Sequence, residues 1–219
     1  MIYSVGLASL VIFFFAILLV ASRLLFQRRM KEKYSFKNMF PFELNYKVYF
    51  KDNLYTHIFL ALFVMSCIGF YATFQTKYND GFLIFEMIAG IICSILILLL
   101  FYVPLVNLRF HIILVAIFFT LNFADVGAVL ISAWRSNQVY VSWASITTMI
   151  LSILIALLDF ALIMNPKLSL DFKPIEVVKE NGEKEYLRPK GIVLAFTEWM
   201  LIFLFIFNIV NIAISTFIV

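Results

Sequence analysis

Residues 80–101 read DGFLIFEMIAGIICSILILLLF, and after Asp80 at its start Glu86 is the one charged residue in this run. The hydrocarbon core of a bilayer, about 30 Å thick, is crossed by about 20 helical residues, whereas a barrel strand needs only about 10. The run is therefore long enough to cross a membrane as a helix. Such a helix would place the Glu86 carboxylate within the bilayer.

Five further stretches share this length and this scarcity of charge. The predicted spans are residues 2–22, 57–74, 81–106, 111–133, 141–164 and 192–219. Hydrophobic residues make up 64% of the chain and charged residues 14%, which lies far from the composition of soluble proteins. The sequence thus predicts an all-α integral membrane protein, a single multi-pass domain over residues 1–219 built as a bundle of six transmembrane helices.

Basic residues indicate the orientation of this bundle, because lysine and arginine collect in cytoplasmic loops. With both termini outside, Lys77 and Arg135 are the only two of the 17 lysines and arginines that lie outside. Aromatic residues are expected at the outer headgroup boundary: Tyr71, Tyr78, Trp134, Tyr140 and Trp143. The first span lacks a basic segment before it, so we expect it to be retained, in a protein of the plasma membrane.

Two larger cytoplasmic loops are expected, residues 23–56 and 165–191. Loop 23–56 mixes lysines with aromatic residues in KYSFKNMFPFELNYKVYFKD, a composition that predicts contact with anionic lipid and no binding of nucleic acid. In loop 165–191, Asn181-Gly182 favours a two-residue hairpin turn that pairs residues 175–180 with 183–188. Because an isolated hairpin is marginal in water, we expect it to pack on the first loop, on the bundle end or on a protein partner.

The last four predicted helices each carry one carboxylate, and the first two carry none. These carboxylates are Glu86, Asp125, Asp159 and Glu198. Charged groups within a span turn toward protein or water, so we expect a four-helix core with the first two helices at its edge. Helical rise places Asp159 and Glu198 at a similar depth, both roughly 10 Å from the inner boundary.

Polar neighbours at helical spacing support these inward faces. Asn122 and Ser132 share a face with Asp125, and Ser152 shares one with Asp159. On the sixth helix, Glu198 is turned away from the line formed by Asn208, Asn211 and Ser215. Two placements of Glu198 stay open: within the span, or at the inner interface, which Trp199 beside it would then mark.

Three functions are compatible with this pattern. No lysine or arginine lies in the spans to neutralise the carboxylates, which indicates movement of a proton, a cation or a small solute through Glu86, Asp125, Asp159, Glu198, Asn122 and Ser152. The same polar residues would also join helices in a noncatalytic membrane subunit or assembly protein. A membrane-embedded metal enzyme would use His57 and His111 with Asp159 and Glu198, although no catalytic motif accompanies them and no cofactor is indicated.

Overall fold

The computed structural model describes residues 2–45, 54–73, 81–103, 108–139, 141–168, 175–178 and 184–217. Its long helices are α1 (Ile2–Met30), α2 (Leu54–Thr73), α3 (Gly81–Leu100), α4 (Leu108–Val139), α5 (Trp143–Ile163) and α6 (Val193–Ser215). The short elements are a 3-10 helix, η1 (Pro41–Asn45), and the strands β1 (Ile175–Val178) and β2 (Lys184–Leu187). All six long helices are long and apolar enough to cross a membrane, as the sequence predicts.

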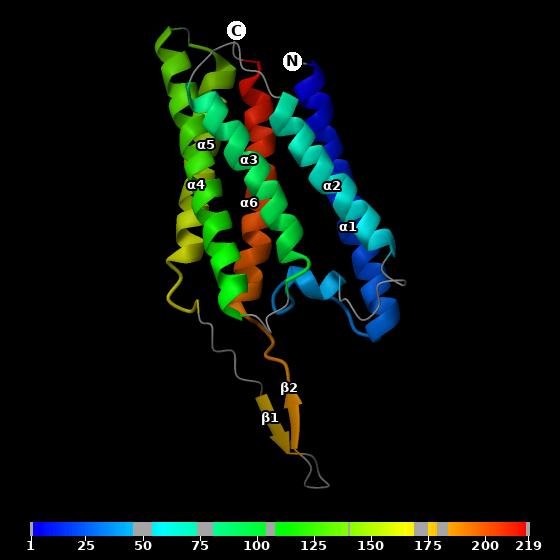
Figure 1. Ribbon diagram of the computed structural model, residues 1–219. Coiled ribbons are helices and arrows are strands. Elements are labelled where there is room, and N and C mark those ends of the chain that lie inside the picture. Colours follow the sequence, from blue (N-terminus) through cyan, green and yellow to red (C-terminus); the bar gives the residue numbers. More distant parts are fainter. Residues whose placement is uncertain are drawn as a thin grey trace.

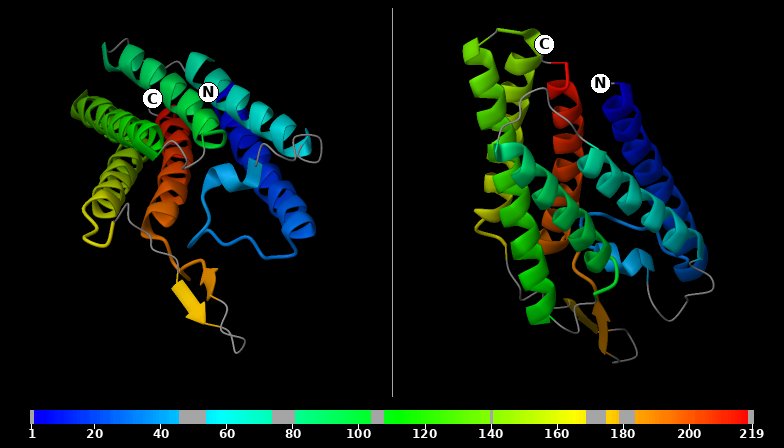
Figure 2. Two further views of the ribbon diagram at one scale, coloured as in Figure 1. Left: turned by 60° about the horizontal axis from the view of Figure 1, so that its bottom comes forward. Right: turned by 45° about the horizontal axis from the view of Figure 1, so that its top comes forward.

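The helices run alternately up and down, so both chain termini lie at one end of the bundle (Figure 1). We call this the terminal end, and we call the opposite end, with η1 and the strands, the loop end. Helix α6 stands in the middle, between α4 and α5 on one side and α1 and α2 on the other (Figures 1 and 2). Most of its residues are buried, which makes it the central helix of the fold.

The buried and exposed faces of helix α5 indicate the surroundings of the bundle. Its buried face is largely polar: Ala144, Ser145, Thr148, Ser152, Ile155 and Asp159. Its outward face carries large apolar side chains instead, among them Ile150, Leu154 and Leu157, the last 60% exposed. A helix in water has the opposite arrangement, so this outer surface is suited to contact with the lipid bilayer.

Helix α1 continues to Met30, eight residues beyond the predicted span 2–22. The predicted span ends at residue 22 because Arg23 is the first charged residue after the apolar run. Arginine is a good helix former. Two more arginines lie in the last turn, where their positive charges interact favourably with the negative end of the helix dipole. The charge therefore limits the span without ending the helix.

The first loop folds back under the bundle and is fastened to α6. The buried Tyr34 hydroxyl donates to the Phe40 carbonyl oxygen at 2.8 Å and accepts from the Trp199 indole N–H at 3.0 Å. The same indole N–H lies 2.9 Å from the Met39 carbonyl oxygen. Burial, and then the charge of Glu43, raise the pKa of Tyr34 well above its ordinary value, which keeps this hydroxyl protonated as a donor.

The two loops also contact each other at the loop end. The Ile192 backbone N–H donates to the Lys37 carbonyl oxygen at 2.8 Å. The Asn38 side-chain amide donates to the Pro189 carbonyl oxygen at 3.1 Å. The Arg188 guanidinium pairs with the Glu43 carboxylate at 2.7 Å. These contacts join segments about 150 residues apart in the sequence.

The predicted hairpin is present, with a different register. Strands β1 and β2 are antiparallel and pair Ile175 with Leu187 and Val178 with Lys184. A two-residue turn at Asn181-Gly182 would instead pair Val178 with Glu185. The strands thus meet one residue out of the predicted register, and the turn itself lies outside the described residues.

Replacing Trp199 with phenylalanine is expected to loosen the first loop. The change keeps an aromatic ring and removes the indole N–H that reaches Tyr34 and Met39, so we expect a loss of about 1–2 kcal/mol in the free energy of unfolding. Thermal unfolding in detergent micelles measures this loss, and limited proteolysis of the first loop should become faster. Trp134→Phe, at a side chain 52% exposed, is the matched control and should change neither. Equal behaviour of the two variants would contradict the fastening role of Trp199.

Candidate functional site

Asp125 on α4 lies in the middle of the bundle and has no exposed surface. Its Oδ2 atom accepts hydrogen bonds from the Tyr71 hydroxyl of α2 at 3.0 Å and from the Asn208 amide of α6 at 2.7 Å. Both donors are neutral. The other carboxylate oxygen, Oδ1, has no hydrogen-bond partner among the described residues.

Space for Tyr71 in this contact comes from Gly90 on α3. A Cβ atom added at Gly90 would overlap the Tyr71 ring, so any larger residue there must displace it. The small size of Gly90 thus leaves room for the Tyr71 side chain of α2 to pass α3 and reach Asp125.

Two further links join α4, α5 and α6. The Asn122 amide donates to Asp159 Oδ2 at 2.9 Å, and the Asn211 amide donates to Ser152 Oγ at 2.8 Å. All four side chains are fully buried. Like Asp125, Asp159 has one oxygen, Oδ1, that meets no donor in the described part of the chain.

These links stack along the bundle axis. The Asn122–Asp159 pair lies nearest the loop end, Asp125 follows about 4.5 Å further along α4, and the Ser152–Asn211 pair lies nearest the terminal end. We call the set the core cluster: Tyr71, Asn122, Asp125, Ser152, Asp159, Asn208 and Asn211.

Glu86 extends this polar interior toward the terminal end. The Ser132 hydroxyl of α4 donates to Glu86 Oε1 at 3.1 Å, and only 2% of Glu86 is exposed. Ser132 follows Asp125 by two helical turns, so Glu86 lies about 10 Å from Asp125 along the axis.

At the loop end, Glu198 forms a buried pair with His111. Its Oε1 atom lies 2.8 Å from His111 Nε2, while His111 Nδ1 lies 2.9 Å from the Val103 carbonyl oxygen. A carbonyl only accepts, so Nδ1 carries a proton, and a second proton is shared between Nε2 and Glu198. The rings of Phe40 and Phe42 meet the imidazole edge-on and close the pair off from below.

The structure corrects the similar depth predicted for Asp159 and Glu198. Their partners on α4, Asn122 and His111, are eleven residues apart, which corresponds to about 16 Å. Helix α5 ends above the loop end of α4 and α6 (Figure 1), so equal distances from the helix ends do not give equal depth. An apolar layer lies between the two levels, where the rings of Phe118 and Phe205 are 5.9 Å apart.

The two histidines proposed as metal ligands lie in separate pairs. His57 Nδ1 is 2.7 Å from the Tyr102 hydroxyl, and the two rings stack, whereas His111 is held by Glu198. Among the described residues no group of three or more His, Cys, Asp or Glu side chains is placed to hold a metal ion.

The structure changes the expected surroundings of Tyr71. Tyr71, expected at the outer headgroup boundary, is fully buried against Asp125, so α2 belongs to the site and not only to its edge. Trp199 is fully buried beneath the first loop. Helix α6 is central, so Glu198 and the line of Asn208 and Asn211 are all buried although they point in different directions.

No protein-family model, curated protein or solved structure matches this chain.

Proposed function

We propose that this bundle moves protons or small cations across the membrane by way of Glu86, the core cluster and the Glu198–His111 pair. The observation that carries this proposal is a set of buried hydrogen-bond acceptors in the core that have no donor. Five buried side-chain oxygens there meet no donor among the described residues: Oδ1 of Asn122, Asp125, Asp159, Asn208 and Asn211.

Unmatched acceptors lower the stability of the fold, and they indicate which species the core would bind. A buried acceptor without a donor costs about 1–3 kcal/mol, and an isolated carboxylate at bilayer depth costs more. A proton on the carboxylate, a cation, or water supplies what these oxygens lack. A purely structural polar cluster would be more stable with each acceptor matched to a donor, so these unmatched oxygens, two of which belong to carboxylates, favour binding of a positively charged species.

The arrangement along the axis favours a gated carrier over an open channel. Polar groups lie at the terminal end with Glu86, in the core cluster, and at the loop end with Glu198. The layer of Phe118 and Phe205 separates the core cluster from Glu198. An ion crossing this layer needs the two rings to move apart, which couples transport to a change in helix packing.

The orientation in this proposal follows the positive charges, with the loop end in the cytoplasm and the protein in the plasma membrane. Exposed basic side chains gather where α1 ends and the first loop begins: Arg23, Arg28, Lys31, Lys33 and Lys37. This surface would rest on the inner leaflet and contact anionic lipid, to which each lysine or arginine near the membrane contributes about 1 kcal/mol.

Replacing Asp125 with asparagine is expected to abolish this transport. The amide keeps the shape of the side chain and cannot take up or release a proton, so flux should fall to that of protein-free liposomes. The test measures proton and cation flux in liposomes holding the purified protein under imposed gradients. Glu185→Gln in the hairpin is the control with the same chemical change, and it should conduct like the wild type. Absence of flux in correctly folded, oriented wild-type protein would reject the proposal.

One observation favours a second function, that of a noncatalytic subunit or assembly protein. The β1–β2 hairpin projects beyond the helices at the loop end (Figures 1 and 2), and a two-stranded hairpin is only marginally stable alone. In this alternative, loop 165–191 docks a soluble protein partner. Replacing residues 175–187 with a short flexible linker should then release a copurifying partner.

A further inference from the structure

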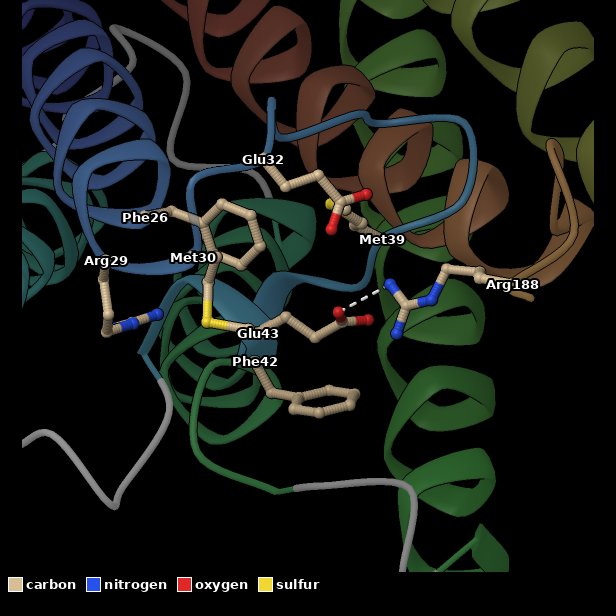
Figure 3. Close-up of a pocket in the computed structure, with 8 residues that line it drawn as sticks. All are labelled: Phe26, Arg29, Met30, Glu32, Met39, Phe42, Glu43 and Arg188. Carbon is tan, nitrogen blue, oxygen red and sulfur yellow. Dashed lines mark hydrogen bonds and ion pairs between the residues drawn. The ribbon is translucent and has the colours of Figure 1, made fainter. Parts of the chain in front are cut away.

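A pocket of about 440 Å³ opens at the loop end, beside the last turns of α1 (Figure 3). Its walls come from three places in the sequence, namely the end of α1, the first loop and Arg188 after β2. The cation pathway proposed above uses none of the charged side chains of this pocket, although Phe42 both lines the pocket and covers His111.

The charges around the pocket are balanced. Two guanidinium groups, of Arg29 and Arg188, and two carboxylates, of Glu32 and Glu43, line it. Arg188 and Glu43 form an ion pair on one side, Arg29 lies on the opposite side, and the Glu32 carboxylate lies near Met39 (Figure 3). A ligand with a single sign of charge would meet like charge here, whereas a zwitterion meets complementary groups of both signs.

The backbone at the end of α1 holds Glu32 in this place. Lys31 has a φ of 55°, in the left-handed region, where a residue with a Cβ atom is sterically strained. This residue ends α1 and turns the chain, and the Glu32 side chain then extends over the pocket toward Met39 (Figure 3). A strained residue that positions a charged side chain is often found where a ligand binds.

The pocket also borders on the surface of α1 that suits lipid. Phe26 and Phe42 give it apolar walls, and Met30, which also lines it, is 51% exposed. Six residues before Met30, Leu24 is 62% exposed on the outside of the same helix. A headgroup in the pocket would therefore leave its acyl chains beside apolar side chains of α1.

We propose that this pocket binds a phosphate ester that carries a primary amine, in the form of the headgroup of an aminophospholipid such as phosphatidylethanolamine. Arg29 contacts the phosphate, Glu32 and Glu43 accept hydrogen bonds from the ammonium group, and Arg188 holds Glu43 in place through their ion pair. Phosphatidylcholine has no N–H to donate, and phosphatidylglycerol has no positive charge for the two carboxylates. The amine is thus the group by which the pocket selects its ligand.

Adjacent arginines provide the matched pair of variants for the test. Arg29 lines the pocket and is half-buried, whereas Arg28 is exposed and does not line it. Binding is measured on the full chain, as retained lipid by native mass spectrometry after exchange into detergent with phosphatidylethanolamine, phosphatidylcholine or phosphatidylglycerol. We expect phosphatidylethanolamine to bind best, and Arg29→Gln and Glu32→Gln each to weaken it about tenfold or more, with Arg28→Gln unchanged.

Soluble phosphoethanolamine, added as a competitor, distinguishes the two sources of this chemistry. If it displaces the lipid only at a large excess, the headgroup is the ligand, with the acyl chains adding affinity. If it binds as tightly as the lipid and with the same sensitivity to Arg29→Gln, the site takes a free phosphoamine. Equal binding of all three lipids, or equal effects of Arg28→Gln and Arg29→Gln, would overturn the proposal, provided that thermal unfolding shows both variants to be folded.

Discussion

His111→Ala is expected to lower the free energy of unfolding by about 3–5 kcal/mol, because it leaves one partner of a buried pair without the other. Glu198 would lose its 2.8 Å contact in a place where neither side chain of the pair is exposed. The Val103 carbonyl would lose its donor as well, and the rings of Phe40 and Phe42 would face an empty space. The measurement is unfolding in mixed micelles.

Glu198→Gln is the informative companion variant. Since Nδ1 of His111 donates to Val103, Nε2 is free to accept a hydrogen bond, and the glutamine amide provides an N–H of nearly the same shape. We therefore expect this change to cost clearly less than His111→Ala. If His111→Ala unfolds like the wild type, the pair does not stabilise the loop end of the bundle.

Gly90→Ala is expected to have the second large effect, a loss of about 1–3 kcal/mol in stability together with reduced flux. The new methyl group would overlap the Tyr71 ring, which then moves and withdraws its hydroxyl from Asp125. Thermal unfolding and liposome flux measure the two effects on the same preparation.

Two other helical glycines serve as controls for this change. A Cβ atom at Gly69 or Gly127 would meet nothing within 4 Å, and alanine favours a helix more than glycine does by about 1 kcal/mol. Gly69→Ala and Gly127→Ala should therefore leave stability unchanged or raise it slightly. If Gly90→Ala behaves as they do, the space beside Tyr71 is not what holds the ring against Asp125.

The helices and the faces of several carboxylates were predictable from local pattern. An apolar run of about 20 residues leaves little choice but a transmembrane helix, and polar residues three or four positions apart indicate an inward face. Glu86, Asp125 and Asp159 are accordingly buried, with 2% exposure or less. The hairpin was visible as well, because two extended segments flank Asn-Gly.

The pairings were not predictable, because they depend on how far one helix is shifted along another. The sequence does not say that Asn122 lies level with Asp159, or that His111 lies level with Glu198, since these pairs are 37 and 87 residues apart. The central place of α6 did have a signal, namely polar residues on two sides of a helix that is otherwise apolar all round, which is typical of a helix buried on both sides. Tyr71 was missed because an aromatic residue near a helix end is usual at the interface, and only Gly90 on the neighbouring helix shows where its ring goes.

The proposed function requires the buried carboxylates of the core cluster to take up and release a proton or cation. Difference infrared spectroscopy of the membrane-reconstituted protein follows this step, by recording carboxyl signals while the external pH or cation concentration is changed. We expect a carboxyl signal that changes with one of these and is missing in Asp125→Asn. A spectrum in which no carboxyl signal responds to either, in protein shown to be folded, would reject uptake of a proton or cation by these carboxylates and leave the core cluster as a structural link between helices.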